Sequence, residues 1–254
     1  MLHSRFVVPG THRVAHAAFS DRWGGYSVPP YNSLNLGRGV GDDDSAVTAN
    51  RNMLAQVLGL QADRLSFTSQ VHGTAVHTVD LDDLNSSVSL DTVEADAQVT
   101  SSPHLGLAVL VADCTPVLLA DPDAGVIASV HAGRKGMAAG VVGAAVESMR
   151  ERGADNIAAI IGPSISPRRY EVPVELREEI AEIEPVAASV SAEGTPAIDV
   201  AAGVAEQLRR EGVRLERWVS ACTYDSPDLF SYRRDAVTGR FAGVIWMEPT
   251  AQPR

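Results

Sequence analysis

Two histidines and one cysteine have the types and contexts of a metal site. His72 follows the apolar run 65–71, Cys114 comes shortly after the run 105–111, and His131 follows the run 126–130. Each run has the length of a buried strand, and a rigid sheet commonly presents functional side chains from its strand ends. We therefore expect these three side chains to converge on one site.

The chemistry of this trio favours zinc. Two imidazoles and one thiolate form a ligand set that suits Zn²⁺, and three protein ligands leave a fourth position open. An open position allows a metal to acidify water or polarise a substrate. The wide separation of the ligands matches no compact zinc finger, so we expect a catalytic metal at His72, Cys114 and His131.

Spacing alone leaves other interpretations open. Cys114 could be a nucleophile activated by His131 or His72, as in a thiol hydrolase that acts on amide bonds. The metal could instead be structural in a non-enzymatic metal-binding protein. A histidine or cysteine at a strand end is also often only packed or hydrogen-bonded.

A basic, glycine-containing segment follows the third member of the trio. Gly133-Arg134-Lys135-Gly136 leads directly into the helix expected at 137–150. Glycines let the backbone approach a ligand, and a helix N-terminus with basic side chains favours an anion such as phosphate. An ordinary loop-to-helix turn with solvated basic side chains fits the segment equally well. Arg22 and Arg233 lie among aromatic residues, where they could meet phosphate or a base, or could have structural roles.

The surrounding pattern predicts strands and helices that position this site. Helical spacing predicts helices at 43–58, 137–150, 174–183 and 199–211, and the polar stretch 80–91 reads as a loop. Apolar runs predict strands at 65–71, 75–79, 105–111, 117–119, 126–130, 157–161, 218–221 and 243–247. The turn-rich first forty residues favour strands joined by ordered loops. Because several strands are adjacent without an intervening helix, we expect a mixed sheet in an α+β or α/β fold, and one domain over residues 1–254.

Composition narrows the class of protein. The chain has 254 residues and a net charge of −11, and such a negative field disfavours binding to nucleic acid. No apolar stretch is long enough to span a bilayer, so we expect no membrane partner. The first residues lack the apolar core of a signal peptide, and with only two cysteines we expect a cytoplasmic protein without a disulfide.

Several short blocks, taken together, resemble one known family. The blocks are Phe19-Ser20-Asp21-Arg22-Trp23-Gly24-Gly25, Ser33-Leu34-Asn35-Leu36-Gly37, Ser69-Gln70-Val71-His72-Gly73, Ala112-Asp113-Cys114-Thr115-Pro116, Val130-His131-Ala132-Gly133, Ile161-Gly162-Pro163-Ser164-Ile165 and Phe230-Ser231-Tyr232-Arg233-Arg234-Asp235. In this order they resemble the laccase-domain, or multicopper polyphenol oxidoreductase, family. Its members are also described as purine nucleoside phosphorylases with adenosine deaminase activity.

The resemblance implies one zinc ion on His72, Cys114 and His131, in a compact domain of mixed sheets flanked by helices. It also implies phosphorolysis of adenosine, inosine, guanosine or methylthioadenosine, and deamination of adenosine. The partners would be nucleoside and phosphate, and we expect a monomer. The family block is usually His-Ala-Gly-Trp-Arg-Gly, so Arg134 and Lys135 depart from it.

On this basis we assign roles to further residues. We expect Arg22 and Asp113 to take part in catalysis, with phosphate on Arg22 or Lys135 and proton movement at Asp113. Asn35, Gln70 and Lys135 are expected to bind substrate.

The family's older name suggests a copper polyphenol oxidase. A laccase-type cluster needs about ten histidine ligands, whereas this chain has seven histidines and no His-x-His pair. We therefore expect a single zinc, which copper can replace.

Overall fold

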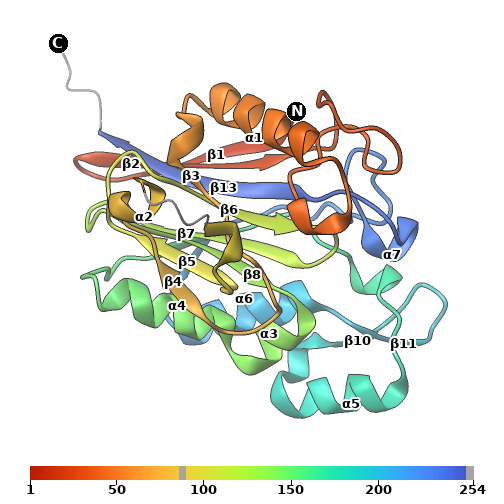
Figure 1. The fold of residues 1–254 in the computed structure, drawn as a ribbon. Coiled ribbons are helices and arrows are strands. Elements are labelled where there is room, and N and C mark those ends of the chain that lie inside the picture. Colours follow the sequence, from red (N-terminus) through yellow and green to blue (C-terminus); the bar gives the residue numbers. More distant parts are fainter. Residues whose placement is uncertain (86–89, 250–254) are drawn as a thin grey trace.

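The computed structural model describes residues 1–85 and 90–249, in which two mixed β-sheets pack face to face (Figure 1). The five-stranded sheet has the order β1-β2-β13-β6-β3, and only its β3–β6 pair is parallel. Its strands are β1 (Leu2–Pro9), β2 (Arg13–Ser20), β13 (Phe241–Pro249), β6 (Gly106–Val111) and β3 (Leu65–Ser66).

The six-stranded sheet has the order β12-β9-β7-β8-β5-β4. The β12–β9 and β4–β5 pairs are parallel, and the others are antiparallel. Its strands are β12 (Arg214–Trp218), β9 (Ala158–Ile161), β7 (Thr115–Asp121), β8 (Val126–Ala132), β5 (Ala97–Thr100) and β4 (Val76–Thr78).

One core fills the space between the sheets. Phe19 and Leu107 from the first sheet meet Leu118 and Ile160 from the second, and all four are almost fully buried. Alternate residues of β7 and β9 point to the opposite face, where they contact helices. Because both faces of these strands are buried, they read as continuous apolar runs in the sequence.

Helices cover the outer face of each sheet (Figure 1). α1 (Asp44–Leu58) packs on the five-stranded sheet through Leu54 and Leu58. Asp43 caps its first turn by accepting a hydrogen bond from the Ser45 amide, and Gly59 ends it with a φ of 79°. The six-stranded sheet is covered by α3 (Arg134–Ala139), α4 (Val141–Arg150) and α6 (Val200–Arg210).

Five smaller elements complete the described secondary structure apart from 3₁₀ turns. α5 (Val174–Ile183) packs beside a two-stranded sheet of β10 (Ala188–Val190) and β11 (Pro196–Ile198). α2 (Leu81–Asn85) and α7 (Tyr232–Asp235) are short. No helix in residues 1–85 and 90–249 is both long and apolar enough to cross a membrane.

The two mixed sheets confirm the α+β fold class, but several element bounds were wrong. The helix expected at 137–150 is two helices, because Gly140 breaks it with a φ of 91°. The strand expected at 65–71 ends at Ser66, since the residues beyond it bond to other segments. His131 lies inside β8 and not after it.

Two further expectations need correction, and three strands were missed. The strand expected at 218–221 lies earlier, at Arg214–Trp218, because this edge strand is polar and exposed and shows no apolar run. The expected loop 80–91 contains α2, and its residues 86–89 lie outside the described residues. The sequence did not predict β5, β10 or β11. That the chain forms one domain stays a prediction.

Candidate metal and substrate site

The trio meets where the chain passes from one sheet to the other. His72 lies between β3 of the five-stranded sheet and β4 of the six-stranded sheet. Cys114 lies in the tight connection between β6 and β7, which also changes sheets. His131 is the second-to-last residue of β8, where it pairs with Pro116 of the neighbouring strand β7. Sheet topology therefore brings three distant segments to one point.

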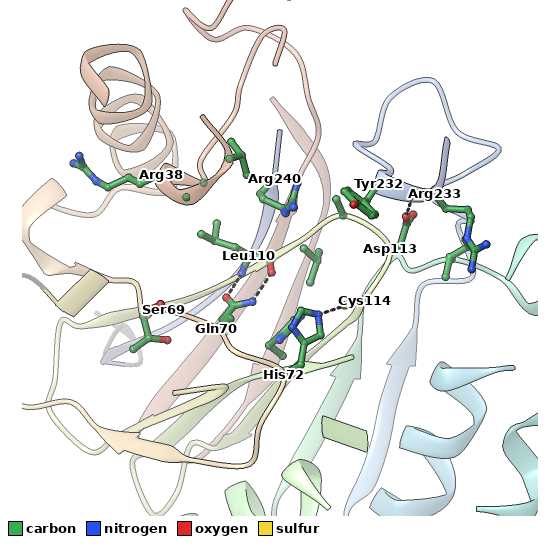
Figure 2. Close-up of a pocket in the computed structure, with 18 of the residues that line it drawn as sticks. Arg38, Ser69, Gln70, His72, Leu110, Asp113, Cys114, Tyr232, Arg233 and Arg240 are labelled. Carbon is green, nitrogen blue, oxygen red and sulfur yellow. Dashed lines mark hydrogen bonds between the residues drawn. The ribbon is translucent and has the colours of Figure 1, made fainter. Parts of the chain in front are cut away.

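The donor atoms have the separations of a single metal site. One ligand atom from each of His72, Cys114 and His131 lies within 4.8 Å of the other two. The His72 Nε2 to Cys114 Sγ distance is 3.6 Å (Figure 2). A tetrahedral zinc separates a sulfur and a nitrogen ligand by roughly the same distance, about 3.6 Å. The residues thus fit one zinc ion, with His131 buried and His72 exposed.

Gly133 is required for this arrangement. A Cβ atom at this position would lie 2.6 Å from His72 Cδ2 and 3.2 Å from Cys114 Sγ. The first distance is shorter than any van der Waals contact between carbon atoms. The glycine two residues after His131 therefore makes room for the other two members of the trio.

A buried carboxylate, Asp96, joins two members of the trio. Its Oδ1 accepts hydrogen bonds from the His72 amide at 2.9 Å and from His131 Nδ1 at 2.7 Å. Its Oδ2 accepts from the amides of Val71 and Gly73 at 3.2 and 2.7 Å. The bond to Nδ1 leaves the other ring nitrogen of His131 to face the site, as carboxylates commonly do for metal-bound histidines. The amide bonds hold His72 in a left-handed conformation with a φ of 62°.

The close contact between the trio's side chains shifts the pKa values of Cys114 and His131. Burial alone would raise the pKa of Cys114, but His131 and His72 lower it to about 6. Burial alone would lower the pKa of His131, but Cys114 and Asp96 raise it to about 9. Without a metal, the pair is therefore a thiolate and an imidazolium at neutral pH. A thiolate is the form of cysteine that binds a metal or attacks a substrate.

A cavity of about 890 Å³ opens beside the trio. Apolar and aromatic side chains form part of its wall, among them Leu110, Ile165, Tyr170, Val200 and Tyr232. Five arginines also line it, namely Arg38, Arg51, Arg134, Arg233 and Arg240. The volume falls within the range of small-molecule sites, and the walls suit a ligand with an aromatic part and an anionic part.

Two of the other predicted site residues line this cavity. Gln70 binds the backbone of Leu110 at both ends of its amide, with distances of 2.6 and 2.8 Å (Figure 2). Asp113, with a φ of 95°, accepts hydrogen bonds from Thr223 Oγ1 at 2.5 Å and from the Arg233 amide at 2.6 Å. Both side chains thus fix the segments that carry the trio.

The remaining three predicted residues lie outside the cavity lining. Arg22 packs its guanidinium on the rings of Trp23 and Phe230 and donates to the Asn32 carbonyl. Asn35 is fully buried and organises the backbone around it. Lys135 is exposed on α3.

Two functional residues, Asp96 and Arg240, were not predicted from the sequence. Asp96 comes directly before β5, a strand that the pattern did not predict, and its role depends on distant amides. Arg240 lies directly before β13, in an irregular segment without an apolar pattern. An acidic or basic residue at the start of a strand is a weak signal, and only the folded chain shows what these side chains face.

The class of protein is defined by comparison with known families. A family model described as multi-copper polyphenol oxidoreductase laccase matches residues 16–248. The chain therefore belongs to this family, as its sequence blocks predicted.

Particular relatives share nearly the whole chain. A purine nucleoside phosphorylase of Streptomyces coelicolor is 52% identical over 98% of this chain and 100% of its own. One from Mycobacterium tuberculosis is 47% identical over 89% of this chain and 90% of its own.

Solved structures are also similar to this fold. A Neisseria meningitidis protein has a TM-score of 0.82 at 32% identity, covering 96% of this chain and 99% of its own. YlmD from Geobacillus stearothermophilus has a TM-score of 0.83 at 30% identity, covering 94% and 97%.

Proposed function

We propose that this protein is a zinc-dependent purine nucleoside phosphorylase that also deaminates adenosine. The observation that carries the proposal is the cluster of His72, Cys114 and His131 at the wall of a cavity lined by aromatic residues and arginines. The names of its relatives support the same activity. Adenosine, inosine, guanosine and methylthioadenosine are the proposed substrates.

In phosphorolysis, a phosphate oxygen forms a bond to the anomeric carbon of the ribose while the bond to the purine nitrogen breaks. The electron pair leaves with the purine, which takes up a proton, and the products are the free base and ribose 1-phosphate. A zinc ion on the trio would supply a Lewis acid beside the reacting groups. The chain's own part is to hold the purine against apolar walls and the phosphate against guanidinium groups.

In deamination, water replaces the exocyclic amino group of adenosine, and ammonia leaves. We assign the movement of a proton to Asp113. This residue directly precedes Cys114 in the chain and lines the cavity, and hydrogen bonds hold its carboxylate in place. Deamination needs no phosphate, so the two reactions can be measured separately.

The test is product analysis with purified, zinc-loaded protein. Adenosine with phosphate should yield adenine and ribose 1-phosphate, together with inosine and hypoxanthine from deamination, and adenosine without phosphate should yield inosine only. Finding neither adenine nor inosine would overturn the proposal. Full zinc content and activity in Cys114→Ala would overturn the site assignment independently.

A second function has support from one feature. His131 Nδ1 bonds to Asp96, and the lowered pKa of Cys114 favours its thiolate form. This Cys-His-Asp arrangement resembles the catalytic residues of a thiol hydrolase that cleaves amide bonds. The two candidates respond differently to reagents. A thiol hydrolase stays active after chelation, whereas the proposed zinc enzyme loses activity. If the metal is only structural, chelation unfolds the chain and the protein converts no nucleoside.

A further inference from the structure

The five arginines of the cavity differ in how much of their charge is already paired. Arg51 donates to both carboxylate oxygens of Asp91, at 2.9 and 2.8 Å. Arg38 lies 3.2 Å from the same carboxylate. Arg233 donates to the Glu171 carbonyl and lies over the ring of Tyr170. These three guanidinium groups hold the cavity wall together.

Arg240 has a different set of contacts. Its Nη1 donates to the carbonyls of Thr238 and Gly239, at 3.0 Å each. Within the described parts of the chain, its Nε and Nη2 make no hydrogen bond, and no carboxylate forms an ion pair with it. These two nitrogens form the edge of the guanidinium that binds an oxyanion in a bidentate manner.

The backbone of Arg240 is fixed in place. Its amide donates to Asn35 Oδ1 at 2.8 Å, and its carbonyl accepts from the Leu36 amide at 3.0 Å. Asn35 is itself fully buried. The predicted substrate residue Asn35 therefore positions Arg240 from outside the cavity. Figure 2 shows the Arg240 side chain on the cavity wall, between Leu110 and Tyr232.

Arg240 is also close to the trio. Burial lowers its pKa, and the negative groups that raise it are Cys114 and Asp113. Asp113 does not pair with it, because both oxygens of this carboxylate accept hydrogen bonds from Thr223 and Arg233. The Nε and Nη2 edge of Arg240 thus lies at the cavity, near Cys114 and Asp113, and has no hydrogen-bond partner among the described residues.

We propose that Arg240 binds the phosphate co-substrate through its Nε and Nη2 edge. This assignment rests on the proposed phosphorylase function and replaces Arg22 and Lys135 as the expected phosphate ligands. The guanidinium transfers no proton. It holds the phosphate so that one oxygen can reach the anomeric carbon, and it balances charge as the purine leaves.

The test compares steady-state constants for base release in four variants. Arg240→Met removes the fork, and Arg240→Lys replaces it with a point charge. Arg134→Met removes a second cavity arginine for which the described residues provide no carboxylate partner and no hydrogen bond to the guanidinium. Arg209→Met is the matched control, because Arg209 is exposed on α6 and its one ion pair with the described residues is to Glu206. Thermal unfolding and zinc content are measured for each variant.

We expect Arg240→Met to raise the KM for phosphate by about 10- to 100-fold, as loss of a charge-assisted hydrogen bond does. The KM for nucleoside should change by less than about threefold, and Arg240→Lys should fall between Arg240→Met and the wild type. A KM for phosphate within about twofold of the wild type in folded, zinc-loaded Arg240→Met would overturn the assignment. A larger rise in Arg134→Met than in Arg240→Met would also overturn it.

Calorimetric titration with inorganic phosphate separates this proposal from the proposed function. If the wild type releases no base but binds phosphate, and Arg240→Met does not bind it, the phosphate site stands and the phosphorylase function fails. If both proteins bind phosphate equally, the assignment of Arg240 fails whatever the activity. If neither protein binds phosphate or releases base, both proposals fail.

Discussion

Replacing Asp96 by asparagine isolates what one buried carboxylate does for the metal site. The two oxygens of Asp96 accept four hydrogen bonds, two on each oxygen. An asparagine has one oxygen, so in either orientation its NH₂ group faces two N–H donors. Either His131 and His72 or Val71 and Gly73 lose their acceptor. The buried negative charge next to His131 is lost as well.

The magnitude follows from these contacts. An unsatisfied buried donor costs about 1–3 kcal/mol, so the two donors that lose their acceptor in Asp96→Asn should lower the free energy of unfolding by roughly 2–6 kcal/mol. Loss of a carboxylate that orients a metal-binding histidine typically lowers metal affinity by about 10- to 100-fold. We expect zinc affinity to fall by this factor, measured by competition with a chelating dye.

Asp121→Asn provides the matched control. Asp121 is equally buried and its carboxylate also accepts four hydrogen bonds, from the amides of Asp123, Ala124, Asp155 and Asn156. It contacts no member of the trio, so Asp121→Asn should lose stability and keep wild-type zinc affinity. If Asp96→Asn also binds zinc like the wild type, Asp96 only anchors the backbone and the reasoning is refuted.

Two further perturbations probe the packing and the charge of the trio. Gly133→Ala should weaken zinc binding by at least about tenfold, because the new methyl group overlaps His72. Gly143→Ala on α4 should keep full affinity, because its methyl group would make only an ordinary contact, 3.6 Å from Glu211 Oε1. Equal zinc affinity in the two alanine variants would contradict the close packing. In a Cys222→Ser background, the rate at which iodoacetamide alkylates metal-free protein should fall as the pH drops through about 6, where the Cys114 thiolate takes up a proton. A midpoint near the ordinary thiol value of about 8.5 would show that the histidines do not act on this thiol.

The sequence predicted the trio because ligand chemistry is local and buried strands are easy to recognise. His72, Cys114 and His131 each sit beside an apolar run, and the blocks around them resemble those of the family. The helix at 174–183 was predicted at the observed bounds, since both ends are marked by a proline nearby and by polar residues. The mixed sheets followed from strands that are adjacent in the chain.

The residues that support the trio could not be predicted in the same way. Asp96 acts through amides 23–25 residues away and through His131, so its role depends on how β5 and β8 pair. Arg240 is set apart from Arg38 and Arg51 because those two arginines already bind the Asp91 carboxylate, and this pairing exists only in the folded chain. Asn35 lies in a recognisable block, yet its contacts show that it holds the backbone of Arg240. Which polar side chain pairs with which distant group is a property of the fold and leaves no local pattern.

The central claim is that His72, Cys114 and His131 hold one metal ion on which nucleoside phosphorolysis depends. The most direct measurement follows ribose 1-phosphate formation from adenosine and phosphate before chelation, after chelation, and after addition of one equivalent of zinc. We expect activity to vanish on chelation and to return with zinc in the wild type, and to stay absent in Cys114→Ala. Undiminished ribose 1-phosphate formation by folded, metal-free protein would contradict the claim.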